Sequence, residues 1–279
     1  MHMPAGGGKA GFDAGFVSAT LEDTLRAGPR VFGVSGLQGS GKSTLAAQLV
    51  AEAARRGIHC ALLSIDDVYL PRAARLRLAR DVHPLLATRG PPGTHEVALA
   101  LEVLDALRAG RGTALPRFDK LADDRLPHAD WRRVDDVDLV LFEGWFLGTP
   151  AETDAALATP LNALERDEDG DGRWRRWCND ALARDYPALW RRIDRLLLLL
   201  APGFEVVPGW RWQAEQAMAA ARPGMPAMDR AAFARFMQHY ERVSRQALRT
   251  LPAIADRVIA LDAARRPRPG PPSAPRPRS

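Results

Sequence analysis

The segment GLQGSGKST, residues 36–44, has the residue types and the spacing of a loop that binds phosphate. It contains the pattern G-x-x-x-x-G-K-S between a predicted strand and a predicted helix. Glycines let successive backbone N–H groups point inward, and the helix N-terminus adds positive partial charge, so an anion is the natural occupant. The alternative is a glycine-rich turn without a ligand. The residues assigned to ATP are Gly36, Gln38, Gly39, Ser40, Gly41, Lys42, Ser43 and Thr44.

The chemistry that this loop supports is phosphoryl transfer. The Lys42 ammonium is expected to reach the β- and γ-phosphates, and the Ser43 hydroxyl is expected to bind Mg²⁺. Among the 39 basic residues of the chain, only three are lysines, namely Lys9, Lys42 and Lys120. A lysine in such a background indicates a site that requires a compact ammonium.

Acidic residues follow two further predicted strands, in SIDDVY (64–69) and LFEGW (141–145). In a parallel sheet, both strand ends lie on the edge that carries the glycine-rich loop. Phosphoryl transfer needs one carboxylate for Mg²⁺ and another that accepts the proton of the attacking hydroxyl. We assign Glu143 to the metal and Asp66 to the base, with Asp67 as the competitor for either role. The alternative is that these carboxylates only cap helices or are solvated.

Short aliphatic runs separated by helical patterns predict the fold that positions these groups. Ser43–Arg56 has helical apolar spacing and is ended by Gly57, and Thr94 is predicted to cap a helix that Gly110 ends. This alternation predicts a doubly wound α/β fold of the P-loop NTPase type, with a mainly parallel sheet and helices on both faces. The predicted strands are residues 30–35, 59–65, 137–143, 195–201 and 256–262.

Two regions of the predicted domain do not fit the alternation of strands and helices. Residues 66–133 are too long for a simple crossover and are predicted to form a substrate-binding excursion. Residues 203–250 are predicted to form two helices that are broken at RPGMP, where a mobile lid is expected. We therefore expect an N-terminal extension (1–28), a catalytic domain (29–262) and a disordered tail rich in proline and arginine (263–279).

The composition narrows the class of function. The formal net charge is +5, and the predicted tail holds five arginines without an acidic residue, so the rest of the chain is neutral and no nucleic-acid partner is expected. Cys60 and Cys178 are far apart and indicate neither a disulfide framework nor a zinc site. Because no apolar run is long enough to cross a bilayer, a soluble cytoplasmic protein without a membrane partner is expected.

Taken together, the motifs resemble a known family. The loop, S-x-D-D-x-Y, P-R-F-D-K, L-F-E-G-W and W-R-W-Q-A-E resemble the phosphoribulokinase/uridine kinase/pantothenate kinase superfamily. More narrowly, RGPPGTHE, LPRFDK, LVLFEGWFLG, PLNALE and WRWQAEQAM look like plant-type D-glycerate 3-kinases and their relatives, over residues 30–262. The resemblance implies ATP and Mg²⁺ and carries the base to Asp66 and the metal-binding glutamate to Glu143. It also places Tyr69 and Arg117 near the substrate and makes Arg211 the arginine of the lid.

A small hydroxy acid needs a cation for its carboxylate and a base near one hydroxyl. Arg89 is the first candidate for the carboxylate, and His95 could hydrogen-bond a hydroxyl or be an ordinary surface residue. Lys120 is assigned to the substrate because lysines are scarce, and Asp67 is assigned to the substrate as well. For the cation that stabilises the transferred phosphoryl group, Arg222 is the second option after Arg211.

The sequence therefore predicts an ATP-dependent kinase of a small molecule. D-glycerate, phosphorylated to 3-phosphoglycerate with release of ADP, is the preferred substrate. The alternatives are a kinase of another small alcohol, of the nucleoside or pantothenate type, and an ATP-binding regulator without transfer chemistry. The sequence does not indicate an oligomeric state.

Overall fold

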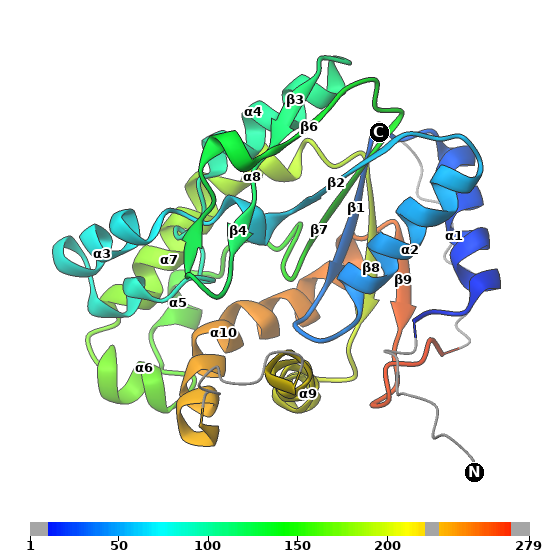
Figure 1. The fold of residues 1–279 in the computed structure, drawn as a ribbon. Helices are drawn as coiled ribbons and strands as arrows, with labels where there is room; N and C mark the ends of the chain where they lie inside the picture. Colours follow the sequence, from blue (N-terminus) through cyan, green and yellow to red (C-terminus); the bar gives the residue numbers. More distant parts are fainter. Residues whose placement is uncertain (1–10, 221–228, 269–279) are drawn as a thin grey trace, which may run out of the picture.

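In the computed structural model, which describes residues 11–220 and 229–268, the chain is organised around a five-stranded parallel sheet (Figure 1). The strand order is β2-β7-β1-β8-β9. These are the five strands predicted from the aliphatic runs, with bounds that differ by one or two residues. They are β1 (Val31–Gly36), β2 (Cys60–Ser64), β7 (Leu139–Gly144), β8 (Arg195–Leu200) and β9 (Arg257–Ala260).

Helices cover both faces of this sheet. Figure 1 shows α1 and α2 on one face, with α4, α8 and α10 on the other. Consequently, every residue of β1 and of β7 is buried, which explains their continuous apolar character. The longer helices are α1 (Ala14–Ala27), α2 (Lys42–Arg55), α3 (Arg72–Asp81), α4 (Val97–Arg108), α7 (Arg173–Arg184), α9 (Val207–Ala220) and α10 (Arg230–Ile254), and the short ones are α5 (Asp154–Leu157), α6 (Ala163–Glu168) and α8 (Tyr186–Trp190).

The order of the strands creates a switch point at the centre of the sheet. The chain leaves β1 toward the β2 edge, and it leaves β7 toward the β9 edge. Ligands of such folds bind outside the carboxyl ends of the strands at this point. Val34 of β1 and Ser64 of β2 are both in register with Glu143 of β7, so the loops that follow these strands meet at one edge.

The predicted excursion contains α3, α4 and two small antiparallel sheets. β3 (Thr113–Leu115) pairs with β6 (Arg132–Val134), and β4 (Phe118–Asp119) pairs with β5 (Asp124–Arg125). The predicted cap at Thr94 is wrong, because α4 has Glu96 at its N-cap. The Thr94 hydroxyl instead accepts from the Gly90 amide at 3.0 Å and donates to the Pro91 carbonyl at 2.7 Å, which holds the turn before the helix.

The two predicted helices after β8 are present, but they differ in their surroundings. α10 packs against β8 and buries Phe233, Met237 and Leu251, so it belongs to the core. α9 lies next to the loop that follows β1. The lid hypothesis therefore concerns α9, while the RPGMP break and Arg222 lie outside the described residues.

Both ends of the described chain are attached to the domain. Val17 and Leu21 of α1 are buried, and α1 packs on α2. After β9, the Arg268 amide donates to the Ala260 carbonyl at 2.8 Å, and Leu261 forms a bridge with Pro267. The first residues of the predicted disordered tail thus form a hydrogen-bonded turn, and residues 269–279 lie outside the described residues.

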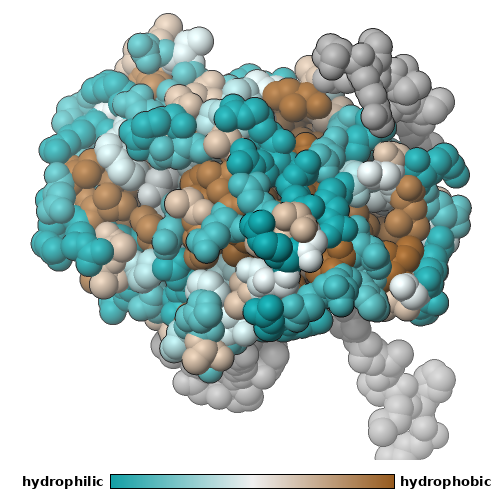
Figure 2. Space-filling view, turned by 90° about the horizontal axis from the view of Figure 1, so that it is seen from above, coloured by the Kyte–Doolittle hydropathy of each residue, from teal (hydrophilic) through white to brown (hydrophobic). Residues whose placement is uncertain are grey.

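Figure 2 views the molecule from above relative to Figure 1, the side on which β1 and β8 begin. Hydrophilic residues on this face are interspersed with smaller hydrophobic patches. Within the described ranges, no helix has both the length and the apolar character needed to span a bilayer.

Candidate active site

The glycine-rich loop joins β1 to α2 with a backbone geometry that strongly favours glycine. Gly39 and Gly41 have φ angles of 78° and 93°, in the left-handed region. A Cβ atom on Gly39 would lie 2.6 Å from the Cβ of Trp210, and one on Gly36 would lie 2.7 Å from the Ser40 hydroxyl oxygen. The loop is therefore a tight cradle of backbone that α9 closes on one side.

Buried polar atoms around this cradle lack hydrogen-bond partners among the described residues. They include both amide atoms of Gln38, the Ser40 hydroxyl and Oε2 of Glu143. Buried polar groups in proteins are nearly always hydrogen-bonded, so these atoms are the ones that a bound ligand and its waters would satisfy. The cradle therefore fits a nucleotide phosphate.

Lys42, Ser43 and Glu143 meet at the start of α2. The Ser43 hydroxyl donates to Oε1 of Glu143 at 2.9 Å, and the Lys42 ammonium lies 4.0 Å from Oε2. Glu143 is only 7% exposed. A hydroxyl beside one buried carboxylate suits Mg²⁺, which takes few protein ligands and completes its shell with phosphate and water. In the described part of the chain, no cluster of three or more acidic, histidine or cysteine side chains forms another metal site.

Asp66 lies on the turn that follows β2, at the same edge as the loop. Its Oδ2 accepts from the Lys120 ammonium at 2.6 Å, and its Oδ1 accepts from the Tyr69 hydroxyl at 2.7 Å. Burial alone would raise the pKa of Asp66, but the charges of Lys120 and Lys42 and the two hydrogen bonds outweigh it. The pKa of Asp66 therefore lies well below its usual range, and the carboxylate is ionised.

Asp67 has a different environment from its neighbour. Its oxygens accept from the backbone amides of Ser64 and Phe118, at 3.4 Å each. Burial, together with the nearby charge of Asp66, raises the pKa of Asp67 to about 6. These contacts make Asp67 a brace between β2 and β4, and the assignment of the base to Asp66 stays a prediction.

The hairpin of β4 and β5 carries Lys120 to Asp66 and is held by two arginines. Arg89 forms an ion pair with Asp123, and its Nη2 donates to the Lys120 carbonyl at 3.3 Å. Arg75, which is 1% exposed, lies 3.0 Å from the other carboxylate oxygen of Asp123. The Phe118 ring lies near both guanidinium groups, at 5.5 Å from Arg89 and 5.8 Å from Arg75. The cation predicted to bind a carboxylate is therefore fixed beside Lys120.

His95 is buried behind Tyr69 and is not a surface residue. The two rings stack with centroids 4.6 Å apart, and the Nδ1 atom of His95 lies 2.7 Å from the Tyr186 hydroxyl. Burial lowers the pKa of His95 to about 3, so the imidazole is neutral. Nε2 of His95 has no hydrogen-bond partner in the described chain. In this position, His95 supports the ring whose hydroxyl binds Asp66, and its contact with a substrate hydroxyl stays a prediction.

Arg211 and Arg117 occupy different positions relative to the loop. A Cβ atom on Gly39 would lie 3.1 Å from the Arg211 backbone nitrogen, so the helix that carries Arg211 touches the phosphate cradle. The Arg211 side chain pairs with Glu215 at 2.7 Å. Arg117 is exposed, and its side chain forms no ion pair or hydrogen bond within the described residues. The backbone of Arg211 therefore borders the phosphate cradle, whereas the side chain of Arg117 is bonded to none of the other predicted site residues that the structure describes.

Three residues that sequence reasoning did not assign belong to the site's framework. Arg75 and Asp123 fix the β4–β5 hairpin, and the Tyr240 hydroxyl donates to the Arg89 carbonyl at 2.9 Å. Two adjacent acids shortly after Lys120, in LADDR, were a signal for Asp123. Tyr240 follows the helical apolar spacing of α10, which predicts packing but gives no indication of its hydrogen bond.

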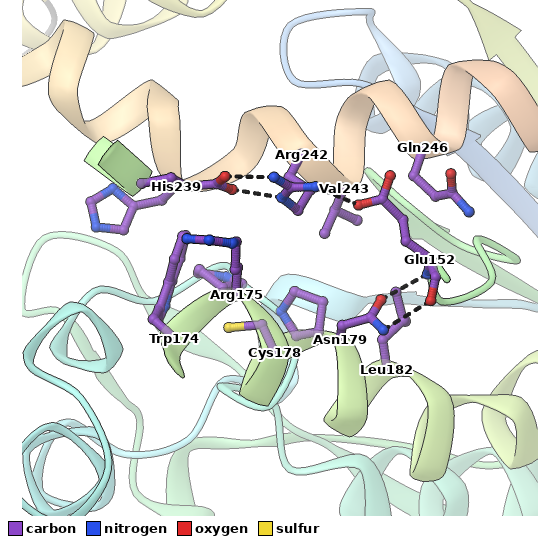
Figure 3. A pocket seen from close by; sticks show the side chains of 13 residues that line it. Glu152, Trp174, Arg175, Cys178, Asn179, Leu182, His239, Arg242, Val243 and Gln246 are labelled. Carbon is purple, nitrogen blue, oxygen red and sulfur yellow. Dashed lines mark hydrogen bonds and ion pairs between the residues drawn. The ribbon is translucent and has the colours of Figure 1, made fainter. Parts of the chain in front are cut away.

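A separate cavity lies between α7 and α10, behind the turn that contains Pro91 and Pro92. Figure 3 shows Arg242 bonded to Glu152, at 3.0 Å. Arg242 also donates to Glu165 at 2.7 Å. The cavity has a volume of about 20 Å³ that the centre of a water molecule can occupy. It therefore holds about one water and is too small for a nucleotide. None of the predicted site residues lines this cavity.

Comparison with known proteins gives relatives that match this site and fold. The chain is 33% identical over 208 residues to the uncharacterized kinase mug58 of Schizosaccharomyces pombe, covering 69% of this chain and 72% of that protein. It is 31% identical over 254 residues to the chloroplastic D-glycerate 3-kinase of Arabidopsis thaliana, covering 84% of this chain and 52% of that protein. D-glycerate 3-kinase from Cryptococcus neoformans has a similar structure, with a TM-score of 0.71 at 26% identity over 91% of this chain and 95% of that one. No family model matches the chain.

The fold and the phosphate cradle, together with these relatives, define an ATP-dependent phosphotransferase of the P-loop type that acts on a small molecule. The chain belongs to the family of P-loop kinases that includes the fission yeast kinase and the D-glycerate 3-kinases.

Proposed function

We propose that the chain transfers the γ-phosphoryl group of ATP to a hydroxyl of D-glycerate, giving 3-phosphoglycerate and ADP. The observation that carries the proposal is the contact between the Lys120 ammonium and the Asp66 carboxylate, at 2.6 Å. It puts a cation for a carboxylate next to a base for an alcohol, and D-glycerate has both groups. Relatives that bear the name D-glycerate 3-kinase in a plant and in a fungus support this choice.

The nucleotide half of the proposed site consists of the loop and the groups around Glu143. Backbone amides of the loop and the Lys42 ammonium would hold the phosphates of ATP. Ser43 and Glu143 would hold Mg²⁺, which supplies charge neutralisation at the β- and γ-phosphates when it is bound. The orphaned Oε2 of Glu143 and the adjacent hydroxyl support this assignment.

The acceptor half is built around Asp66. Its carboxylate would accept the proton of the substrate hydroxyl as the oxygen attacks the γ-phosphorus in line with the leaving ADP. Arg89 and Lys120 would bind the substrate carboxylate, and Arg211 on α9 would approach the transferred group. The contact of α9 with Gly39 supports this role, because it keeps the backbone of Arg211 beside the phosphate cradle.

A substrate-dependent ADP assay with the purified protein tests this function. The panel contains D-glycerate, L-glycerate, glycerol, uridine and pantothenate, and ADP release that depends on D-glycerate is the expected result. Turnover of uridine or pantothenate without turnover of D-glycerate would move the assignment to another small alcohol. ATP binding without ADP release in any mixture would instead identify a nucleotide-binding regulator.

The Asp66→Asn variant separates transfer from binding. Loss of the base is expected to lower kcat by about 10²- to 10⁴-fold, while ATP affinity measured by calorimetry stays unchanged. The matched variant Asp67→Asn keeps Asp66 and should retain most of the transfer activity. If Asp67→Asn abolishes transfer and Asp66→Asn does not, the two roles are exchanged.

A further inference from the structure

Both oxygens of the Asp66 carboxylate are already occupied by protein donors. The Tyr69 hydroxyl takes Oδ1 at 2.7 Å, and the Lys120 ammonium takes Oδ2 at 2.6 Å. Each carboxylate oxygen can accept a second hydrogen bond, but the Lys120 ammonium lies on Oδ2 and stabilises its negative charge. These contacts therefore block the base by making the Asp66 carboxylate a weak proton acceptor while Lys120 stays bound to it.

The two donors differ in how firmly they are held. Tyr69 is 2% exposed, and its ring stacks on His95 and packs edge-on against Phe118 at 5.2 Å. The side chain of Lys120 is 49% exposed and extends from the tip of a hairpin with two-residue strands. A long exposed side chain rotates in nanoseconds, whereas a packed aromatic ring does not leave its position. Lys120 is thus the donor that can move.

The backbone of Lys120 is fixed independently of its ammonium. Its carbonyl accepts from Nη2 of Arg89 at 3.3 Å, and Arg89 in turn pairs with Asp123. The ammonium can therefore leave Asp66 while the hairpin stays in place. An anion that binds at Arg89 therefore lies beside Lys120 and can attract its ammonium.

We propose that Lys120 gates the base: the ammonium blocks Asp66 until an acceptor that carries a carboxylate draws it away. This inference rests on the proposed function and deepens it, because it makes the negative charge of the acceptor a requirement for catalysis as well as for binding. The Lys120 ammonium can pair with the Asp66 carboxylate or with the carboxylate of the acceptor. When the acceptor binds, the ammonium moves from the first to the second. Free of Lys120, Oδ2 of Asp66 faces the acceptor hydroxyl.

The step that follows is balanced in atoms and charge. The hydroxyl proton moves to Oδ2 of Asp66, the hydroxyl oxygen forms the new bond to the γ-phosphorus, and the bond from that phosphorus to the β,γ-bridging oxygen breaks. ADP leaves with the electron pair of that bond, and Asp66 later releases its proton to solvent. Without an acceptor, the blocked carboxylate cannot take a proton from water, so ATP is not hydrolysed.

The test measures ATP hydrolysis without acceptor and transfer to D-glycerate for Lys120→Met and the wild type. Unblocking the base is expected to raise acceptor-free ATP hydrolysis about tenfold or more. Loss of a charge-assisted contact to the acceptor carboxylate is expected to lower kcat/KM for D-glycerate about 10- to 100-fold. Lys120→Arg, which retains a cation, should keep acceptor-free hydrolysis low.

Two controls keep the result interpretable. Arg133→Met removes an exposed arginine that pairs with Asp135 on a different small sheet, and it should change neither rate. ATP affinity by calorimetry should be the same for all variants, which shows that the phosphate cradle is intact. Because the Lys120 side chain is half-exposed, none of these variants is expected to unfold the protein.

Two outcomes would overturn the gate. One is acceptor-free hydrolysis in Lys120→Met that is no faster than in the wild type, and the other is wild-type turnover of glycerol as efficient as that of D-glycerate. Failure of the proposed function looks different, since the wild type would then not use D-glycerate at all. In that case, the comparison of acceptor-free ATP hydrolysis between Lys120→Met and the wild type still tests whether Lys120 blocks Asp66.

Discussion

The guanidinium of Arg75 donates to the backbone carbonyl of Asp123 at 2.6 Å and lies 3.0 Å from its carboxylate. Arg75 is the buried residue of α3, and it also donates to the carbonyls of Leu70 at 3.2 Å and Ala87 at 2.7 Å. Asp123 has a φ of 54°, an unusual angle for a residue with a side chain, and these contacts stabilise it. One buried arginine thus ties together the segments that carry Tyr69, Arg89 and Lys120.

Replacing this arginine tests its role as a positioning residue. Arg75→Met leaves buried carbonyls unpaired, which should lower the free energy of unfolding by about 3 kcal/mol. We also expect the KM for the acceptor to rise about tenfold while ATP affinity is retained, since the phosphate loop is not among its contacts. Arg75→Lys should recover part of both losses, and Arg192→Met, which breaks the half-buried pair with Asp105, is the control. An equal loss of ATP affinity in Arg75→Met would contradict a role specific to the acceptor side.

A methyl group at Gly39 should disrupt the phosphate cradle. The added Cβ would lie 2.6 Å from the Trp210 Cβ at a φ of 78°, so the loop or α9 must shift. Because displacements near 1 Å at such sites cost about a hundredfold, Gly39→Ala should weaken ATP binding by about that factor in calorimetry. Gly57→Ala is the matched control, since Gly57 has a similar φ of 73° but open space around it. That variant should lose about 1 kcal/mol of stability and keep its ATP affinity.

The metal assignment can be tested at Glu143. Glu143→Gln retains the size of the side chain and its acceptor for Ser43, but it removes the negative charge that Mg²⁺ requires. We expect the Mg²⁺ concentration for half-maximal activity to rise about 10- to 100-fold in a titration at saturating ATP. Removal of Mg²⁺ with a chelator should abolish transfer in the wild type. An unchanged Mg²⁺ titration in Glu143→Gln would assign the metal to other groups.

The pKa of Asp67 predicts a pH dependence of stability with a defined sign. Its value of about 6 in the folded protein exceeds the ordinary 3.8, so the folded state keeps a proton that the unfolded chain releases. Asp67 therefore reduces stability as the pH rises from about 4 to about 6, by up to about 3 kcal/mol. In urea unfolding, Asp67→Asn should gain stability relative to the wild type across this window. Asp105→Asn should show the opposite trend, because the hydrogen bond to Arg192 lowers the pKa of Asp105.

The sheet and the nucleotide half of the site could be predicted because their signals are local. Each core strand is a continuous aliphatic run, and burial on both faces leaves no other pattern possible for β1 and β7. The order of loop, acidic turn and strand-end glutamate also predicts that Asp66 and Glu143 lie at one edge of the sheet. The bounds of β9 differ by up to two residues, since strand ends carry no distinct signal.

The acceptor half could not be predicted to the same degree, because contacts between distant segments build it. Arg75 lies in a strongly polar helix, where nothing in the sequence distinguishes a buried arginine from an exposed one. β4 and β5 have two residues each, which is too short for a periodic pattern. Thr94 has the residue type of a helix cap, but its hydroxyl is engaged by the Gly90 turn.

The contact between Trp210 and the phosphate loop has a practical consequence. The indole is 3% exposed, its Nε1 donates to the Ala263 carbonyl at 2.8 Å, and its Cβ side borders Gly39. Any rearrangement of the cradle therefore alters the surroundings of a chromophore that is native to the chain. Intrinsic fluorescence, with Trp210→Phe as the blank, gives a label-free optical signal for occupancy of the cradle.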